Sequence, residues 1–450
     1  MPNLGRIVKA YDIRGVVPDE LDEDVARSIG AAFVRFLGAD TIVTAHDMRE
    51  SSPGLARAFA EGAAGQGADV IEAGLGSTDL LYFASGSLGV PGAMFTASHN
   101  PARYNGIKLC RAGAAPVGQD SGLADIRGMV EAGVPAYDGA PGTISQRDML
   151  GDYADYMRKL VPGLDGMRRL SVVVDAGNGM GGLTVPVVFE GLPLDLTSLY
   201  FELDGSFPNH EANPIEPENL RDLQAKVRET GADLGLAFDG DADRCFVVDE
   251  RGEIVSPSVL TALIAVRELE KQPGSTIIHN LITSHAVPEI VREHGGEPVR
   301  TRVGHSFIKA TMAETGAVFG GEHSGHFYFR DFWRADSGML AALHTLAALG
   351  ASDGPLSALL AEFSRYAASG EINTEVDDQK GRMAAVENEF AGRDGAAVDH
   401  LDGLTVELAD GSWFNLRPSN TEPLLRLNVE GRDEAAMAEL RDAVLQIVRG

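Results

Sequence analysis

The strongest constraint on the fold is a pattern that occurs three times along the chain. Each copy consists of a short apolar strand, a loop, a helix, a glycine and a second strand, and the copies span residues 41–71, 170–196 and 276–299. Strands that alternate with helices at this spacing favour a parallel sheet covered by helices, with one hydrophobic core for each copy. We therefore predict three related α/β domains, whose copies share the pattern but no evident residue-level identity.

The segments outside the repeat complete this prediction. Residues 6–10 predict a short strand, residues 21–37 a helix that ends at Gly38, and residues 340–366 a helical stretch rich in Ala and Leu. The pattern changes near residue 370, where strands at 372–376, 403–408, 413–416 and 425–429 combine with helices at 380–390 and 432–447. This combination indicates a small α+β domain. We place the domain limits at residues 1–150, 151–252, 253–366 and 367–450.

Charge and cysteine content exclude several classes of partner. The chain has 450 residues and a formal net charge of -28, which disfavours binding to nucleic acid or to an anionic membrane. The two cysteines give no disulfide framework, and the first residues lack the apolar segment of a signal peptide. No apolar run approaches the roughly 20 residues of a membrane span. We expect a cytoplasmic protein in which local Arg and Lys residues meet any anionic ligand.

A serine lies in the loop Thr96-Ala97-Ser98-His99-Asn100-Pro101, between a predicted buried strand and a second strand that contains Lys108. A serine at a strand end, before a proline, is placed as a nucleophile must be, and His99 or Lys108 could activate it. The alternative is an ordinary Ser/Asn-rich turn followed by proline. The remaining loops decide between these interpretations.

A second loop offers three carboxylates at alternate positions. The predicted strand at residues 234–238 leads into Asp239-Gly240-Asp241-Ala242-Asp243-Arg244. An EF-hand is excluded because Arg244 stands where that loop needs glycine, and because strands flank the segment where an EF-hand needs helices. We predict that this loop binds a divalent metal, rather than that it is a solvated acidic turn. Three carboxylates together with water and a phosphate oxygen suit octahedral Mg²⁺.

Three further loops carry polar groups suited to a phosphorylated sugar. Arg14 in the loop at residues 11–15 could bind a phosphate bidentately, although a surface salt bridge is the simpler interpretation of that loop alone. The segment at residues 320–326 places Glu, Ser and His among glycines, which favours contacts with sugar hydroxyls over a zinc site made by His323 and His326. The turn at residues 417–423 combines Arg417 with hydroxyl and amide groups and is either an anion cup or an ordinary turn.

The glycine-rich loop at residues 175–179 follows another predicted strand. It lacks the lysine of a Walker motif and the full dinucleotide fingerprint. We therefore interpret it as a tight turn rather than a phosphate cradle.

Taken together, these loops resemble those of the α-D-phosphohexomutase superfamily, in its phosphomannomutase/phosphoglucomutase branch. The matching segments are residues 96–101, 239–244, 321–326 and 417–421, in the same order along the chain. The resemblance implies three α/β/α domains and a C-terminal α+β domain similar to the TATA-binding-protein fold, arranged around a central cleft. Ala242 departs from the pattern, since many relatives have a glycine there, and His323 occupies a position that varies between branches.

The resemblance also implies roles for individual residues. Ser98 resembles the phosphoserine that carries the transferred group and completes a metal site with Asp239, Asp241 and Asp243. Glu322 and Ser324 resemble the sugar-hydroxyl contacts. The site of the unreactive phosphate resembles a group of four residues: Arg417, Ser419, Asn420 and Thr421. Further cleft positions match Tyr11, Arg14, Lys108, Arg244, His305 and His326.

These roles imply a phosphohexomutase that converts hexose 6-phosphate to hexose 1-phosphate through a bisphosphorylated sugar, with Mg²⁺ as cofactor. We expect activity on mannose and glucose phosphates, because O3 and O4 have the same configuration in both sugars. Lys108 or His326 could act as the general acid/base, and the sequence does not choose between them.

Three rival functions remain at this point. A silent sugar-phosphate-binding protein would be expected to lose Ser98 or a metal aspartate, and none is lost. Phosphoglucosamine mutases usually open the serine loop with Ser, where this chain has Thr96. A metal-dependent phosphatase has no need for both the sugar loop and the phosphate cup. The sequence does not decide the oligomeric state, and we expect a monomer or a weak homodimer.

Overall fold

The structure is a computed structural model that describes residues 4–419 and 423–450, with the backbone alone described for His305 and Ser306. Contacts within the chain divide it into two compact units. The first contains residues 1–260 and 324–359, and the second contains residues 261–323 and 360–450. Within the described ranges, no helix is both long enough and apolar enough to cross a membrane.

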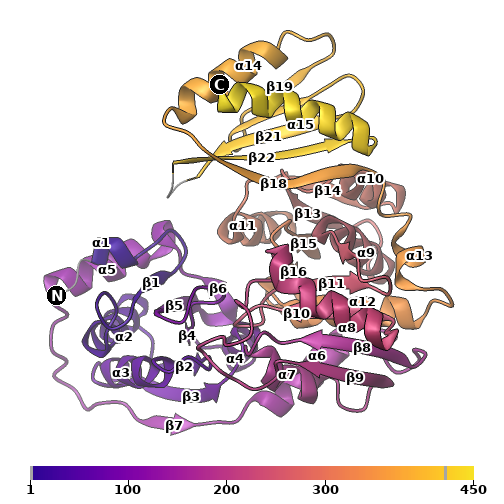
Figure 1. Ribbon diagram of the computed structural model, residues 1–450. Coiled ribbons are helices and arrows are strands. Elements are labelled where there is room, and N and C mark those ends of the chain that lie inside the picture. Colours follow the sequence, from indigo (N-terminus) through magenta and orange to yellow (C-terminus); the bar gives the residue numbers. More distant parts are fainter. Residues whose placement is uncertain (1–3, 420–422) are drawn as a thin grey trace. The chain divides into compact units, whose positions relative to one another are not determined.

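The N-terminal sheet of the first unit has the strand order β1-β5-β4-β2-β3-β7, with β6 beside β5 (Figure 1). Strands β4, β2, β3 and β7 are parallel, whereas β5 runs antiparallel to its neighbours β1, β4 and β6. The strands are β1 (Ile13–Val16), β2 (Thr41–His46), β3 (Asp69–Leu75), β4 (Gly92–Phe95), β5 (Tyr104–Arg111), β6 (Ala115–Pro116) and β7 (Ile144–Gln146). The helices are α1 (Leu4–Ile7), α2 (Glu23–Leu37), α3 (Ser52–Ala64), α4 (Thr78–Leu88) and α5 (Leu123–Ala132).

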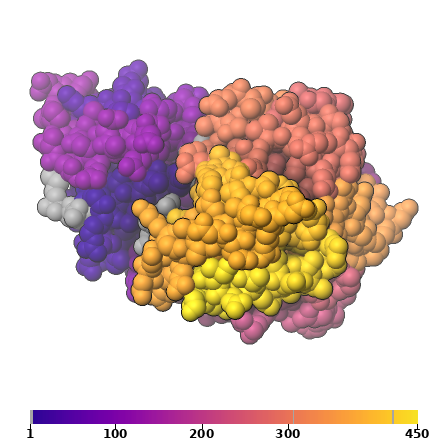
Figure 2. Space-filling view, turned by 90° about the horizontal axis from the view of Figure 1, so that it is seen from above, coloured from indigo at the N-terminus to yellow at the C-terminus, as the bar shows by residue number. Residues whose placement is uncertain are grey.

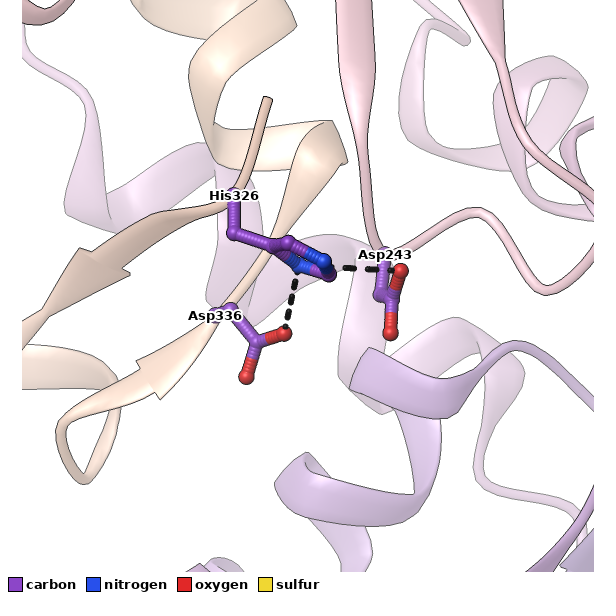
Figure 3. A group of neighbouring side chains, drawn as sticks. All are labelled: Asp243, His326 and Asp336. Carbon is purple, nitrogen blue, oxygen red and sulfur yellow. Dashed lines mark hydrogen bonds and ion pairs between the residues drawn. The ribbon is translucent and has the colours of Figure 1, made fainter. Parts of the chain in front are cut away.

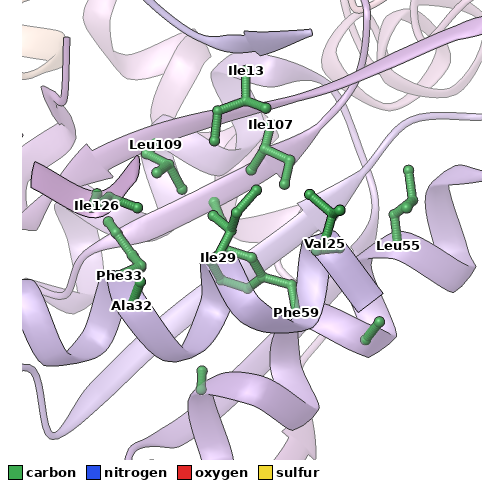
Figure 4. Packing of buried hydrophobic residues seen from close by; sticks show 14 of the residues in the cluster. Ile13, Val25, Ile29, Ala32, Phe33, Leu55, Phe59, Ile107, Leu109 and Ile126 are labelled. Carbon is green, nitrogen blue, oxygen red and sulfur yellow. The ribbon is translucent and has the colours of Figure 1, made fainter. Parts of the chain in front are cut away.

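Helix α2 shows how the sequence sets the limits of an element. Asp22 caps its first turn by accepting a hydrogen bond from the backbone of Val25, and Gly38 ends it in the left-handed conformation, with a φ of 60°. Its apolar residues recur at helical spacing and pack against the sheet and the helices α3 and α5 in one core (Figure 4). Members of this core include Ile29, Phe33, Phe59, Ile107 and Ile126.

The second sheet of the first unit has the order β12-β11-β10-β8-β9. Strands β9, β8 and β10 are parallel, and β10, β11 and β12 are antiparallel. The strands are β8 (Leu170–Asp175), β9 (Leu194–Leu199), β10 (Leu234–Phe238), β11 (Cys245–Asp249) and β12 (Ile254–Val255). The helices are α6 (Leu150–Leu160), α7 (Gly181–Val188) and α8 (Arg221–Thr230).

A later segment of the chain completes the first unit. The strands β16 (Phe327–Phe329) and β17 (Ala335–Asp336) form an antiparallel pair. Helix α12 (Gly338–Gly350) follows, and all of its residues are buried. It packs against α6, β11 and β16. Helix α13 (Leu356–Leu360) ends this segment.

The second unit begins within α9 (Pro257–Lys271) and contains two sheet regions. Strands β13 (Thr276–Asn280), β14 (Glu297–Thr301) and β15 (Phe319–Gly321) are parallel, with the helices α10 (Ala286–Glu293) and α11 (His305–Thr315). The C-terminal sheet is antiparallel in the order β18-β22-β21-β20-β19. Its strands are β18 (Ala367–Glu375), β19 (Ala397–Asp399), β20 (Leu404–Glu407), β21 (Trp413–Pro418) and β22 (Leu424–Gly431).

The helices of the C-terminal region, α14 (Gln379–Phe390) and α15 (Glu434–Arg449), both pack on one face of this sheet (Figure 1). Figure 2 looks onto their outer surface, coloured from orange to yellow. The expected α+β character of this region is therefore confirmed.

The strand-helix-strand pattern that the sequence predicts three times is also confirmed. Its copies are β2-α3-β3, β8-α7-β9 and β13-α10-β14, and in each copy the two strands pair in parallel. The first and second copies lie in the first unit, and the third lies in the second unit.

Two expectations were wrong. Residues 6–10 do not form a strand, because Leu4 and Ile7 are buried on one face of the short helix α1, and only Val8 makes an isolated bridge, to Ile13. The helical stretch expected at residues 340–366 is divided between α12 and α13. The break lies at the turn before Pro355, whose ring fixes φ and removes a backbone donor.

Candidate active site

Ser98 lies where the N-terminal sheet reverses its strand order. The chain passes from β2 to β3 on one side and then crosses to β4 on the other side of β2. Ligands of open α/β sheets bind beyond the carboxyl ends of the strands at such a point. The loop after β4 carries Ser98, and the loop after β2 carries Asp47 and Arg49.

The backbone of Ser98 is in the left-handed region, with a φ of 49°, which is uncommon for a residue other than glycine. Its amide donates to the hydroxyl of Thr96 over 2.9 Å. Its own hydroxyl donates to Asp239 Oδ2 over 2.8 Å and lies 3.2 Å from His99 Nδ1. The first and second sheets therefore meet at this serine.

The metal loop, residues 239–244, connects the antiparallel strands β10 and β11. The side chains of Asp239, Asp241 and Asp243 are buried, and one ligand atom from each lies within 4.8 Å of those of the other two. The Oδ1 atoms of Asp241 and Asp243 are buried without a hydrogen-bond partner in the described part of the chain. Buried carboxylate oxygens without partners are costly unless a cation meets them, so this cluster fits a hard divalent metal.

At Gly240 the metal loop directly contacts the loop that carries Ser98, residues 96–101, which we call the serine loop. A Cβ atom at this position would lie 2.4 Å from the carbonyl oxygen of Ser98, so only glycine allows the approach. Two positions later, Ala242 adopts a φ of 59°, a left-handed conformation that glycine adopts more readily than alanine.

Two cations lie against the carboxylates, one from β5 and one from the metal loop itself. Lys108 on β5 donates to Asp241 over 2.7 Å and to Asp243 over 2.6 Å. Arg244 Nε donates to Asp239 over 2.8 Å. These contacts partly neutralise a cluster of like charges that would otherwise repel one another.

The pKa values of these groups diverge with their environments. Burial raises the pKa of Asp239, Arg244 opposes this shift, and Asp243 and Asp241 add to it. Burial acts in the same direction on Asp241, but Lys108 outweighs it, and the pKa of Asp241 is lowered. Burial lowers the pKa of Lys108, but the two carboxylates outweigh it and raise this pKa well above its ordinary value. The lysine is therefore a cation at pH 7.

Helix α4 holds the metal loop from the side of the N-terminal sheet. Thr78 at its start donates from its hydroxyl to Asp241 Oδ2 over 2.6 Å, and its amide donates to the carbonyl of Asp241 over 3.0 Å. The adjacent Asp79 accepts hydrogen bonds from Tyr153 over 2.8 Å and from Ser337 over 2.7 Å. The start of α4 thus connects segments that are far apart in the sequence.

His326 lies between two carboxylates (Figure 3). Its Nδ1 is 3.1 Å from Asp336 Oδ2 and 3.9 Å from Asp243 Oδ1. Burial lowers the pKa of His326, but Asp243 and Asp336 outweigh it, and the pKa is raised. Asp336 also orients the ring, and this places His326 beside the metal loop as a candidate proton donor.

Other residues of the first unit that the sequence predicts for the site have fewer contacts with the carboxylates. Arg14 on β1 donates to Asn100 and to Asp12, so it reaches the serine loop through Asn100. Tyr11 is 41% exposed at the same end of β1. Burial and the charge of Arg244 hold the pKa of His99 well below its ordinary value, so its neutral Nδ1 can accept from Arg244.

The expected sugar loop runs from β15 to β16, and the chain passes from the second unit to the first between His323 and Ser324. In the second unit, Glu322 is buried and accepts a hydrogen bond from the amide of Gly304 over 3.2 Å. In the first unit, Ser324 is partly buried, and a Cβ at Gly325 would lie 2.5 Å from the ring of Phe246.

The expected phosphate loop begins at the end of β21. Arg417 Nη2 donates to Glu371 over 2.9 Å, and the amide of Ser419 donates to the carbonyl of Leu424 over 2.8 Å. Burial lowers the pKa of His323, Glu371 opposes this shift, and Arg417 adds to it. His323 is therefore an electrostatic neighbour of Arg417 within the second unit.

Three expected residues cannot be placed in full. Asn420 and Thr421 lie outside the described residues. His305 is the first residue of α11, and its side chain is not described.

The loop at residues 175–179 is a tight turn, as expected. Asp175 Oδ1 accepts from the amide of Gly177 over 2.8 Å, and its Oδ2 lies 3.0 Å from His210 Nε2. Both carboxylate oxygens are thus bonded within the second sheet's own region. Within the described residues, Asp175 belongs to no group of three side chains that could hold a metal.

The first unit therefore brings together Ser98, Lys108, Arg244, His326 and the three aspartates, and Arg14 reaches them through Asn100. Residues that the sequence did not single out also belong to this arrangement, namely Arg49, Thr78 and Asp336. No motif marks them, because each acts through a contact between distant segments.

Comparison with known proteins identifies the family. Models of the phosphoglucomutase/phosphomannomutase family match residues 5–133 (alpha/beta/alpha domain I), 152–252 (domain II), 256–366 (domain III) and 371–447 (C-terminal domain). The chain is 43% identical over 449 residues to phosphohexose mutases of Xanthomonas campestris pv. campestris, covering 98% of this chain and 99% of the relative. It is 40% identical over 447 residues to phosphomannomutase of Escherichia coli K12, covering 97% of each.

Among solved structures, a phosphoglucomutase/phosphomannomutase family protein from Burkholderia thailandensis superposes with a TM-score of 0.88 at 35% identity, covering 100% of this chain and 98% of the other. The chain belongs to the phosphoglucomutase/phosphomannomutase family of the α-D-phosphohexomutase superfamily. It is a phosphohexomutase, an isomerase that acts on phosphorylated hexoses.

Proposed function

We propose that this phosphohexomutase interconverts the 6-phosphates and 1-phosphates of mannose and glucose, with Ser98 as the carrier of the phosphoryl group. The observation that carries the proposal is the hydrogen bond of 2.8 Å between Ser98 and Asp239, at the edge of a buried carboxylate cluster. The names of the relatives support mannose phosphate as a substrate.

The reaction proceeds in two transfers. The bond between phosphorus and Ser98 Oγ breaks, a bond to a sugar hydroxyl oxygen forms, and the hydroxyl proton passes to a base of the enzyme. The bisphosphorylated sugar then turns and returns its other phosphate to Ser98. Lys108 and His326 both lie beside the carboxylates and remain the two candidates for moving the proton. A protonated lysine can donate a proton to the sugar oxygen in the return transfer, and it can accept one only after it has lost its own.

We propose Mg²⁺ as the metal, held by Asp239, Asp241, Asp243 and an oxygen on Ser98. The buried Oδ1 atoms of Asp241 and Asp243 support this choice, since a hard cation with oxygen ligands would satisfy them. When bound, the ion supplies positive charge that stabilises the charge of the transferring phosphoryl group. Arg244 supplies a further cation at the same place.

Recognition of the sugar and of its unreactive phosphate is assigned to separate loops. Glu322 and Ser324 are proposed to contact sugar hydroxyls. Arg417, Ser419, Asn420 and Thr421 are proposed to bind the phosphate, and Tyr11, Arg14 and His305 are proposed to complete the substrate contacts. Because the intermediate must bind in two orientations, the sugar contacts must use O3 and O4, which occupy similar space in both.

This requirement predicts the substrate range. Mannose and glucose differ only at C2, so kcat/KM for their 1-phosphates should lie within about two orders of magnitude of each other. An amino group at C2 is a larger change, and glucosamine phosphate should be a much poorer substrate. A preference for glucosamine phosphate would show that the enzyme recognises the substituent at C2. That result would favour a phosphoglucosamine mutase.

The direct test measures phosphoryl transfer itself. Incubation with a hexose 1,6-bisphosphate should phosphorylate the protein, and peptide mass spectrometry should place the group on Ser98. The variant Ser98→Ala should lose turnover by several orders of magnitude and take up no phosphate, whereas Ser87→Ala, at an exposed serine of α4, should behave as the wild type. Near-normal turnover of Ser98→Ala would refute the carrier, and a protein that binds the sugar phosphates without turnover would be the silent binding protein.

We further propose that the enzyme is cytoplasmic and is a monomer or a weak homodimer. Its four domains are proposed to span residues 1–150, 151–252, 253–366 and 367–450. The two free cysteines, Cys110 and Cys245, are buried and support a protein without disulfides.

A further inference from the structure

One buried arginine outside the proposed catalytic groups makes an unusual set of contacts. Arg49 follows β2 and is 1% exposed. Its Nε donates to Asp47 over 3.2 Å, and its Nη1 donates to the carbonyls of Pro101 over 3.1 Å and Tyr104 over 2.9 Å. Its Nη2 donates to the carbonyls of Ser98 and Asn100, both over 2.7 Å. All five N–H donors of a guanidinium are thus used. Three of them bind backbone carbonyls of the serine loop, and a fourth binds that of Tyr104 at the start of β5.

Neighbouring residues fix this guanidinium in turn. Asp47 is buried, and its Oδ1 accepts from the hydroxyl of Ser52 over 2.6 Å and from the amide of Arg49 over 3.0 Å. The ring of Phe207 lies 5.1 Å from the guanidinium, and a Cβ at Gly205 would approach the Arg49 Cα to 2.7 Å. The arginine is therefore enclosed on the side of the second sheet as well as on that of the first.

We propose that Arg49 is a positioning residue that holds the serine loop in the conformation needed for phosphoryl transfer. The carbonyl that it binds at residue 98 belongs to the residue with a φ of 49°, and a left-handed backbone persists only where its surroundings hold it. Without these bonds the carbonyls of Ser98 and Asn100 can turn, and the hydroxyl of Ser98 moves with its own backbone. This inference rests on the proposed role of Ser98.

A purely structural role predicts a different outcome. If Arg49 only filled the interior, its loss would weaken the whole domain and leave the folded fraction fully active. If it positions the loop, its loss acts locally and lowers the rate of transfer, since a displacement of about 1 Å at a reacting group can cost about 100-fold. Binding of the unreactive phosphate, which is assigned to the segment near Arg417, should be unaffected.

The test uses Arg49→Lys in the full-length enzyme. Lysine keeps the charge beside Asp47 but has three donors on one atom and cannot bridge four carbonyls. We expect kcat to fall about 100-fold, with KM for the hexose 1-phosphate within about threefold of the wild type. Hydrogen exchange of the amides at residues 97–105 should become at least about tenfold faster, while that of β2, β8 and β10 stays unchanged.

Arg57→Lys is the matched control. Arg57 lies on α3 in the same domain and forms ion pairs with Glu61 and Glu72 at the surface, so the same substitution should leave kcat and exchange unchanged. Retention of kcat within about threefold in a folded Arg49→Lys protein would overturn the proposal, as would an exchange increase spread evenly over the domain.

A milder variant covers the possibility that Arg49→Lys does not fold. Asp47→Asn keeps Arg49 and its carbonyl contacts but removes the charge that fixes the guanidinium. It should lower kcat about tenfold and speed exchange at residues 97–105 alone. Wild-type kcat and exchange in a folded Asp47→Asn protein would also overturn the proposal. Exchange requires no turnover, so these results remain distinct from a failure of Ser98 as carrier, which only Ser98→Ala decides.

Discussion

Two loops that follow neighbouring parallel strands of one sheet have opposite characters. The loop after β8 contains Asp175, whose two oxygens are bonded to Gly177 and His210. The metal loop after β10 contains three buried aspartates, and its positive charge comes from Lys108 on β5 and from Arg244. Two carboxylate oxygens of the metal loop have no hydrogen-bond partner within the described residues.

The difference teaches how a structural carboxylate can be told from one that serves chemistry. A carboxylate that the fold satisfies by itself stabilises a turn and needs nothing further. A group of buried carboxylates whose oxygens exceed the available donors lowers stability until a cation joins it. Substitution in the two loops should therefore act on different properties, stability in one and turnover in the other.

The largest effect should follow Asp243→Asn in the metal loop. Loss of one negative charge and one metal ligand should lower kcat by about 1,000-fold at saturating Mg²⁺. The free energy of unfolding of the metal-free protein should stay within about 1 kcal/mol of the wild type, because Lys108 keeps Asp241 as a partner. Steady-state assays and urea unfolding in EDTA measure the two quantities, and a large loss of stability with normal kcat would reverse the comparison.

The opposite result is expected for Asp175→Ala. Removal of the carboxylate leaves the Gly177 amide and the His210 ring without their partner and should lower the free energy of unfolding by about 3 kcal/mol. The protein that remains folded should keep kcat within about threefold of the wild type, since within the described residues the Asp175 side chain bonds to Gly177 and His210, neither of which is assigned to transfer. Urea unfolding and assays at low temperature check this, and a loss of kcat as large as that of Asp243→Asn would show that the turn also serves the site.

A smaller effect should follow Thr78→Val, which tests how the metal loop is held from outside. The change removes the hydroxyl that orients Asp241, and loss of a group that orients a metal ligand typically costs about tenfold in metal affinity. Titration with Mg²⁺, followed both by activity and by the thermal midpoint, measures this affinity. Thr184→Val provides the control, because that buried hydroxyl donates to the carbonyl of Met180, the residue before α7. Equal affinities in the two variants would contradict the role of Thr78.

The smallest effect should appear in the pH dependence of stability. Burial lowers the pKa of His210, but the hydrogen bond and the charge of Asp175 outweigh it, and the pKa is raised. A raised folded-state pKa means that the protonated ring contributes stability below the unfolded value of about 6.5, and that this contribution is lost as the pH rises through the folded value. Urea midpoints of the wild type should therefore fall more steeply than those of His210→Gln as the pH rises above about 6.5. Parallel curves would show that the pair is not coupled to folding.

The sequence predicted the elements of the repeat because their signals are local. Apolar spacing, Asp22 before α2 and Gly38 after it determine where that helix begins and ends. The prediction for residues 6–10 was wrong because a short apolar segment suits a strand as well as one turn of helix. The packing of Leu4 and Ile7 into the core decided the outcome, and no local rule contains that contact.

The candidate site likewise contains residues that local sequence signals reveal and residues that only tertiary contacts reveal. The loops around Ser98 and Asp239 could be singled out because several functional groups occur within a few residues of each other. The sequence could not single out Arg49, Thr78 and Asp336. Each is a single polar residue whose role depends on a partner between 10 and 163 residues away. The distance of 2.8 Å between Ser98 and Asp239 likewise joins loops that are 141 residues apart.

The placement of α12 has a consequence for biosynthesis. This helix is apolar and buried along its whole length, and it packs against α6 and β11, which are translated long before it. At about 5–20 residues per second, the ribosome delivers α12 several seconds after β11 has emerged. During that interval the nascent chain exposes the apolar surface that α12 will cover, and a fragment that ends at residue 260 exposes it permanently. The first unit thus reaches its folded state only after α12 has been translated.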